Sequence, residues 1–329
     1  MNIRFKKYIK LFFAIIILFN SKNTSILNAQ GFRGYYQYPD IHDNTIVFTS
    51  EGDIWKVSVN GGLAQRLTTH PEEERYANIS PDGKILAYSA SYEGPTEIYT
   101  MPINGGITTR WTYESETSSV TNWSPDNKII YQTQAYNKLP DEQLVTIDLK
   151  TRIKSVVPLY QASEGTQNEK GDWIFIRPAD HGDAAKRYIG GTARQIWKFD
   201  GKNEAVKLTN DYDGESHKPM WYDGRVFFIS DRDGIMNIWS MDSDGNNLEQ
   251  HTKHEEYDVR YSNIHDGKIV YQHAADIWLL DVSTGSYNKI NISLASDLDQ
   301  LREKWDENPS RYITSVSSDP NGEKIVVTA

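Results

Sequence analysis

The chain has 329 residues and a formal net charge of −10, from 35 basic and 45 acidic residues. This length suits one large all-β domain or two ordinary domains. The acidic excess excludes a typical nucleic-acid-binding protein, because phosphate binding needs clustered lysines and arginines. Aromatic residues make up 12% of the chain and cysteine is absent. This composition favours packed sheets and excludes a disulfide framework.

Residues 1–29 are predicted to be a secretory signal rather than part of the fold. Four basic residues stand among the first ten, and the apolar run Leu11–Phe19 follows them. Nine apolar residues are too few to span about 30 Å of hydrocarbon, so cleavage near Ala29 is favoured over an uncleaved anchor. Cleavage would change the net charge from −10 to −15, because the segment holds five basic residues and no acidic ones. We therefore expect a periplasmic or secreted protein without a membrane attachment.

A short motif, in which an acidic or amide residue precedes an apolar and an aromatic one, recurs along the chain. Its five copies are Asp53-Ile54-Trp55, Glu97-Ile98-Tyr99, Gln195-Ile196-Trp197, Asn237-Ile238-Trp239 and Asp276-Ile277-Trp278. With a weaker copy at Leu144, the apolar positions lie 39 to 52 residues apart. Alternating apolar residues, such as Val226 and Phe228, indicate strands and exclude a helical solenoid. Repeats of this length that hold four short strands predict an all-β, six-bladed β-propeller over residues 36–292.

The fourth repeat, at about 162–215, carries an insertion at 178–194 that is rich in glycine, alanine and charged residues. Loops on a rigid scaffold often bind ligands, and a basic loop in an acidic protein would attract peptide carboxylates. Docking of a neighbouring domain is the alternative interpretation. The residues predicted to make peptide or interdomain contacts are Arg177, His181, Lys186, Arg187 and Arg194.

The motifs of common catalytic and metal sites are missing, so no catalytic residue, metal site or cofactor is predicted. The sequence has no Gly-x-Ser-x-Gly elbow and no His-Glu-x-x-His helix motif. His251 and His254 follow a blade turn, which does not align two imidazoles as a helix would. The segment 242–246 has glycine at its fourth position rather than the sixth, so it indicates a β-turn instead of a calcium loop.

The repeat pattern breaks at residues 293–310, which are predicted to form a short linker helix. Apolar residues recur there at three- or four-residue intervals: Leu294, Leu298, Leu301 and Trp305. That spacing is helical. Residues 311–329 then resume a β pattern, and the chain stops inside an expected strand. We therefore expect this sequence to be the N-terminal part of a longer polypeptide, with 311–329 as the first strands of a second propeller.

Two features of the repeats resemble known propeller families. Turns such as Ser80-Pro81-Asp82-Gly83, each followed by an aliphatic strand, resemble the PD40/TolB-type repeat. The runs Tyr188–Trp197, with its Gly-Gly-Thr segment, and Phe227–Gly234 are similar to the N-terminal six-bladed propeller of tricorn-type proteases. The resemblance covers Tyr36–Ala329.

The resemblance to tricorn-type proteases implies a long serine peptidase. A seven-bladed propeller, a PDZ-like module and a serine-protease core would follow this segment, and that core would hold the catalytic serine and histidine. The present chain would then serve as a channel, filter or interdomain wall. Its implied partners are peptides and the C-terminal domains of the same polypeptide, and the family also implies homo-oligomeric assembly.

One stretch departs from this family pattern. Archaeal members have a paired arginine after the second blade that anchors the substrate carboxylate, whereas this chain has the acidic stretch Tyr113–Ser118, with Arg110 as the only nearby arginine. The resemblance therefore does not assign carboxylate anchoring to this position. Two other functions stay open, a free-standing TolB-like binding propeller and the propeller of a prolyl-oligopeptidase-like enzyme.

Overall fold

The computed structural model describes residues 33–177, 186–298 and 308–328. The predicted signal at 1–29 and the insertion residue His181 lie outside these ranges. The chain divides into two compact units, Met1–Ala295 and Ser296–Ala329. Among the described residues, no helix combines the length and the apolar character needed to cross a membrane.

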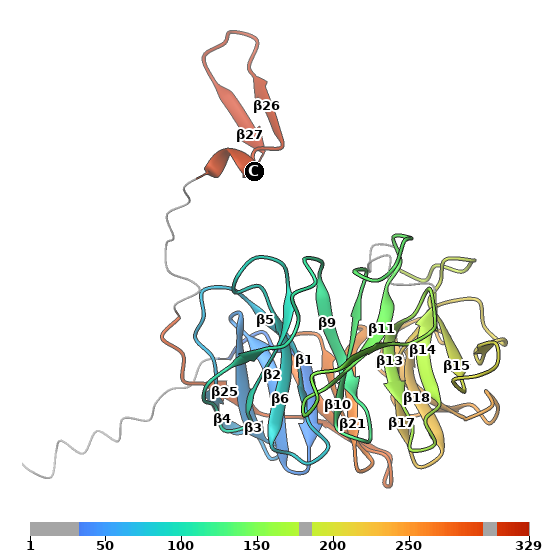
Figure 1. Ribbon diagram of the computed structural model, residues 1–329. Helices are drawn as coiled ribbons and strands as arrows, with labels where there is room; N and C mark the ends of the chain where they lie inside the picture. The colour runs from blue at the N-terminus through green and yellow to red at the C-terminus, as the bar shows by residue number, and fades with distance from the viewer. Residues whose placement is uncertain (1–32, 178–185, 299–307, 329) are drawn as a thin grey trace, which may run out of the picture. The chain divides into compact units, whose positions relative to one another are not determined.

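The first unit is a six-bladed β-propeller, as the repeats predict, and Figure 1 shows its sheets side by side. Blade one contains β1 (Gln37–His42), β2 (Thr45–Ser50), β3 (Asp53–Ser58) and β4 (Gly62–Arg66). Blade two contains β5 (Glu74–Ile79), β6 (Ile85–Ala90), β7 (Glu97–Pro102) and β8 (Thr109–Arg110). Blade three contains β9 (Ser118–Trp123), β10 (Lys128–Thr133), β11 (Gln143–Asp148) and β12 (Lys154–Val156).

The other three blades follow the same plan. Blade four contains β13 (Ser163–Gln167), β14 (Trp173–Arg177), β15 (Gln195–Phe199) and β16 (Val206–Lys207). Blade five contains β17 (Ser216–Tyr222), β18 (Arg225–Ser230), β19 (Asn237–Asp242) and β20 (Glu249–Gln250). Blade six contains β21 (Val259–His265), β22 (Lys268–His273), β23 (Asp276–Asp281) and β24 (Ser286–Lys289). Consecutive strands of a blade pair antiparallel, so each blade is a simple meander.

The recurring motif begins the third strand of its blade and fixes the chain that follows the fourth strand. The backbone N–H of Ile54 donates a hydrogen bond to Thr68 Oγ1 at 2.8 Å, and that of Ile98 donates to Thr112 Oγ1 at 2.8 Å. The same bond joins Ile196 to Thr209 and Ile238 to Thr252. Because this bond recurs in four blades, the motif is explained by its attachment to the chain after the fourth strand, without a role in ligand binding.

The polar residue of the motif is buried in four of the five copies and has a partner on or after the fourth strand. Asp53, which is 0% exposed, accepts a hydrogen bond from Arg66 Nε at 2.9 Å. In blade five, the equivalent Asn237 accepts a hydrogen bond from Thr252 Oγ1 at 2.8 Å. A buried polar group needs such a partner, which accounts for an acid or amide at this position.

Blade one gains a fifth strand, which closes the ring. Strand β25 (Ile292–Leu294) pairs parallel with β4, and Leu294 is fully buried in the core between blades one and six. From the other end of the propeller, the Tyr36 N–H donates to the Ala275 carbonyl at 3.1 Å, and its hydroxyl donates to the Ile292 carbonyl at 3.0 Å. The prediction that the linker begins at residue 293 is therefore wrong, because residues 293 and 294 belong to strand β25. Residues 299–307 of the predicted helix lie outside the described residues.

Closure leaves no space for a side chain at Gly61. This residue has a φ of +76°, and a Cβ atom there would lie 2.3 Å from the Asn291 carbonyl oxygen, which accepts a hydrogen bond from the Gly62 N–H. Gly61→Ala is expected to lower the free energy of unfolding by about 2–3 kcal/mol, from backbone strain and the displaced hydrogen bond. Urea denaturation measures this change.

A matched control exists at Gly285, which has a φ of +69° and open space within 4 Å of the position that a Cβ atom would take. Gly285→Ala should lower the free energy of unfolding by only about 1 kcal/mol, because it adds the strain of the left-handed backbone and no steric clash. Equal losses in the two variants would show that the contact at Asn291 does not contribute to closure.

The second unit contains a short 3₁₀ turn and a hairpin. Its elements are η2 (Pro309–Tyr312), β26 (Ser315–Ser318) and β27 (Ile325–Thr328). Strands β26 and β27 pair antiparallel across a turn in which the Asp319 carboxylate accepts hydrogen bonds from the backbone of Glu323 and Lys324. An aspartate that bonds to the backbone a few residues later is a common stabiliser of such turns.

Candidate functional site

The first strand of each blade faces a central channel, and each of these strands is bulged. One cavity is lined by residues of all six first strands, which places these strands around the axis. The register of every first strand shifts against its neighbour. Five of the bulges hold a non-glycine residue with φ between 41° and 53°, namely Tyr38, Tyr76, Glu164, Lys218 and Tyr261.

Such backbone conformations are uncommon for residues with a side chain, and each costs on the order of 1 kcal/mol. Their recurrence at equivalent positions of five blades indicates a shared structural feature of the blades rather than a local irregularity. A bulge re-aims one side chain and commonly occurs beside functional sites. In five blades of this propeller it turns one large or charged side chain towards the channel.

Three of these residues form a cluster of aromatic rings that narrows the channel. The ring centroid of Tyr38 lies 4.5 Å from that of Tyr76 and 4.4 Å from that of Tyr261. The cavity beside the cluster has a volume of about 30 Å³, which is room for one or two water molecules. Burial raises the pKa of both Tyr38 and Tyr76 above the ordinary value of 10.0, so their phenols stay neutral.

An ion pair completes the constriction. Lys218 Nζ lies 3.2 Å from Glu164 Oε1, and the Lys218 backbone N–H donates to Glu164 Oε2 at 2.7 Å. The same ammonium lies 5.8 Å and 5.6 Å from the ring centroids of Tyr76 and Tyr261, within the range of a cation–π interaction. The Lys218 ammonium at the centre of the propeller thus interacts with two aromatic faces and one carboxylate.

The carboxylate of this pair is held in its charged form. Burial by itself raises the pKa of Glu164, but the charge of Lys218, the contact with His217 and the charge of Arg194 outweigh it. The net effect is a pKa well below the ordinary value of 4.5. The constriction can therefore offer a peptide neutral hydroxyls, an ammonium and a carboxylate, but the described residues hold no nucleophile paired with a base there.

These channel residues are not among the predicted contact residues, although the sequence carries a signal for them. Three blades share the pattern Tyr-x-Asp/Asn-Ile, at Tyr38–Ile41, Tyr76–Ile79 and Tyr261–Ile264. The polar residue of the pattern joins neighbouring blades: the Asp40 carboxylate accepts a hydrogen bond from the Ile79 N–H at 2.6 Å. The tyrosine two positions earlier is the bulged residue, so the pattern locates the constriction.

Two of the predicted contact residues lie at the base of the blade-four insertion and are engaged within the propeller. Arg177 Nε donates to the Gln161 carbonyl at 2.9 Å. Arg194, which is 6% exposed, donates from Nε to Glu215 Oε2 at 2.6 Å. These arginines therefore fix blade four to its own entry strand and to the start of blade five.

The insertion itself reaches the next two blades. Lys186 pairs with Asp258, just before blade six, and Arg187 Nε donates to the Gly234 carbonyl in blade five at 2.7 Å. Each of the four described residues has a different partner, so the structure does not gather them into one binding surface. His181 lies outside the described residues. A peptide or interdomain contact of this set stays a prediction.

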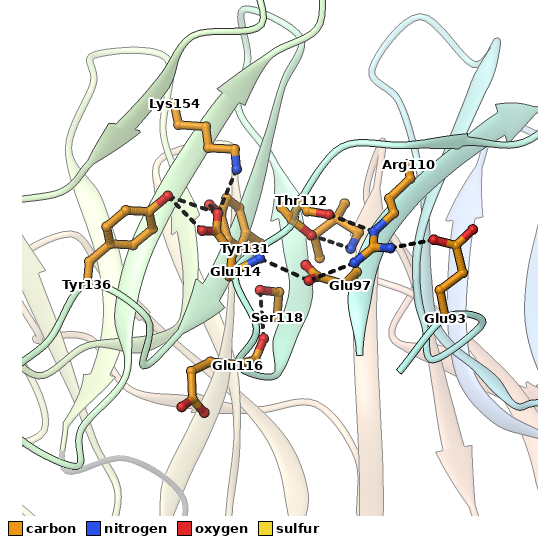
Figure 2. A network of polar contacts seen from close by, with 11 residues as sticks. Glu93, Glu97, Arg110, Thr112, Glu114, Glu116, Ser118, Tyr131, Tyr136 and Lys154 are labelled. Carbon is orange, nitrogen blue, oxygen red and sulfur yellow. Dashed lines mark hydrogen bonds and ion pairs between the residues drawn. The ribbon is translucent and has the colours of Figure 1, made fainter. Parts of the chain in front are cut away.

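The stretch that departs from the family pattern is a closed polar network, drawn in Figure 2. Arg110 donates hydrogen bonds to Glu93 at 2.6 Å and to Glu97 at 3.1 Å, and its guanidinium lies 4.3 Å from the ring centroid of Tyr113. Two protein carboxylates therefore occupy the donors that a peptide carboxylate would need.

The acidic residue after Arg110 is also satisfied internally. Glu114 Oε1 accepts hydrogen bonds from Lys154 at 2.7 Å, from Tyr131 at 2.9 Å and from Tyr136 at 2.9 Å (Figure 2). Its backbone N–H donates to Glu97 at 2.9 Å. This network joins blade two to blade three and does not form a site for a substrate carboxylate.

Comparison with known proteins places this architecture. Residues 33–286 match the family described as the tricorn protease N-terminal β-propeller domain. The chain is 27% identical over 292 residues to tricorn protease homolog 1 of Streptomyces coelicolor, covering 87% of the chain and 27% of that protein. It is 29% identical over 295 residues to the tricorn protease homolog of Saccharolobus solfataricus, covering 83% of the chain and 26% of that protein.

The fold also matches a solved structure. The crystal structure of the tricorn protease aligns with a TM-score of 0.76 at 23% identity, covering 91% of this chain and 30% of that one. The present chain thus spans about a quarter of the length of the curated relatives that it matches.

Proposed function

The chain belongs to the family of tricorn protease N-terminal β-propeller domains, and we propose that it is the non-catalytic propeller of a longer serine peptidase. In this role it forms a channel or wall beside a peptidase core that other segments supply. The observation that carries the proposal is the constricted channel, in which side chains from bulged strands of five blades point to one axis.

The chemistry of the constriction suits peptides. Tyrosine hydroxyls exchange hydrogen bonds with backbone amides, and an ammonium beside a carboxylate can recognise either end of a short peptide. The narrow channel would exclude long or folded chains and admit short peptides. We propose peptides and the C-terminal domains of the same polypeptide as partners, together with homo-oligomeric assembly. The segment 1–29 supports export to the periplasm or the cell exterior.

The test uses the complete polypeptide with a widened channel. Replacing Tyr76 and Tyr261 together by alanine removes two of the three rings and is expected to raise the rate of hydrolysis of longer peptides several-fold. Hydrolysis of a dipeptide-sized chromogenic substrate should change less, because a small molecule passes the constriction more easily. Steady-state assays over a series of peptide lengths measure this difference.

Tyr160, whose side chain is 76% exposed on the surface, provides the control, and Tyr160→Ala should leave both rates unchanged. Circular dichroism confirms that the double variant is folded. An identical length profile for the wild type and the double variant would contradict a role of this channel in peptide passage.

A further inference from the structure

A cluster of two histidines and one aspartate lies where blade six meets blade one. His42 ends β1, Asp43 stands in the turn after it, and His265 ends β21 of blade six. One ligand atom from each of these residues lies within 4.8 Å of the others. The ring centroids of the two imidazoles are 4.1 Å apart.

From this geometry we propose that His42, Asp43 and His265 bind a divalent transition-metal ion that links blade one to blade six. Two imidazoles and a carboxylate are the ligand set of many zinc and iron sites, with the remaining positions open to water. Motif spacing in the sequence could not reveal such a site, because 222 residues separate Asp43 from His265.

The separations between ligand atoms leave room for an ion between them. His265 Nε2 lies 3.3 Å from Asp43 Oδ1, and His42 Nδ1 lies 3.5 Å from Asp43 Oδ2. The first contact is a long hydrogen bond, which an ion would replace, and the second lies beyond the usual N–H···O range. Two ligands at about 2.0–2.1 Å from a tetrahedral ion stand about 3.3 Å apart, which agrees with both separations.

The orientation of His42 is set by the neighbouring blade. Its Nε2 lies 3.0 Å from the Pro81 carbonyl oxygen, which can only accept a hydrogen bond, so Nε2 carries the proton. In the neutral ring, Nδ1 then presents a lone pair towards the Asp43 carboxylate, and a metal ion between these two acceptors would bind both. Metal-binding histidines commonly donate their second N–H to a backbone carbonyl in this way.

The ring has little freedom to turn away. A Cβ atom at Gly83, whose φ is +70°, would lie 2.8 Å from an atom of the His42 ring, so the turn of blade two packs directly on the imidazole. The side chains of His42 and His265 are 15% and 29% exposed, while Asp43 is 75% exposed. The two imidazoles are thus pre-positioned, and the carboxylate faces solvent where an ion can enter.

The position of the site gives it a structural role. Blades one and six come from opposite ends of the propeller sequence, and β25, which follows blade six, joins the sheet of blade one through parallel pairing with β4. An ion held from both sides of this junction would stabilise the closed ring, since a ligand that binds only the folded state shifts the folding equilibrium.

The experiment titrates the purified, metal-free chain with Zn²⁺ by calorimetry, and with Co²⁺ by visible absorption. We expect one ion per chain, a tetrahedral Co²⁺ spectrum and a rise in the thermal unfolding midpoint with added Zn²⁺. At a free concentration of about 100 times the Kd, the folding equilibrium constant should increase about 100-fold. His42→Ala and His265→Ala should each weaken Zn²⁺ binding at least tenfold.

A second pair of neighbouring histidines supplies the matched control. His254 and His273 have ring centroids 3.8 Å apart, and His273→Ala should leave Zn²⁺ affinity unchanged. If wild-type chain binds no ion, or if His265→Ala binds Zn²⁺ as tightly as wild type, the proposal is wrong. Binding that falls equally in the His273→Ala variant would indicate only general affinity for surface imidazoles and would also overturn it.

Discussion

Replacing Glu164 by alanine is expected to lower the free energy of unfolding by about 3–5 kcal/mol, because removing one partner leaves a buried charge uncompensated. Lys218 would lose the carboxylate that lies 3.2 Å from its ammonium, and its backbone N–H would lose an acceptor. His217, 3.6 Å from the same carboxylate, would also lose its charged neighbour. Urea denaturation followed by tryptophan fluorescence measures the loss.

The effect of Glu164 should depend on pH in a defined direction. Because its pKa in the folded state lies below 4.5, its contribution to stability is present above pH 4.5 and is lost as the pH falls through the folded value. The difference between wild type and Glu164→Ala should therefore shrink at acid pH. Glu204→Ala, at an exposed position, should change stability by less than about 0.5 kcal/mol at any pH. A similar small change in Glu164→Ala would contradict the ion pair.

Arg110→Ala should also destabilise the propeller by about 3–5 kcal/mol, since Glu97 is 1% exposed and would lose the guanidinium that pairs with it. If Arg110 anchored peptides, its loss would instead weaken peptide binding by a protein of unchanged stability. Thermal unfolding and a peptide-binding assay on the same sample separate these two roles.

A surface pair of the same residue types provides the control for Arg110. Arg75 and Glu73 also form an ion pair, but their side chains are 48% and 38% exposed. Arg75→Ala should cost at most about 1 kcal/mol, because solvent screens an exposed pair. If both arginine variants lost the same small amount, the network in Figure 2 would not stabilise the protein.

The propeller could be predicted from sequence because every blade repeats the same arrangement of four short strands. In four blades the backbone N–H of the apolar motif residue, such as Ile54 or Ile238, donates to a threonine after the fourth strand, and this shared arrangement keeps the period visible. Ring closure could not be predicted in the same way. Strand β25 is three residues long, and its Leu294 also fitted a helical spacing that continued to Trp305. Parallel pairing with β4 depends on a contact across more than 200 residues.

The candidate sites were less visible than the fold. The sequence drew attention to the basic insertion, where Arg194 proved to be buried against Glu215. The channel tyrosines were not predicted, because a bulge at Tyr38 or Tyr261 is a backbone feature that strand alternation does not reveal. Likewise, His42 and His265 become neighbours only when the first and last blades meet.

The claim that this propeller contributes a channel but no catalysis is tested most directly by assaying the purified chain alone. The chain is incubated with a mixture of peptides and, separately, with a fluorophosphonate probe that labels active serines, beside a serine peptidase as positive control. We predict no peptide cleavage and no labelling of the chain. Peptide cleavage that follows the purified chain through gel filtration, together with labelling of one of its serines, would contradict the claim.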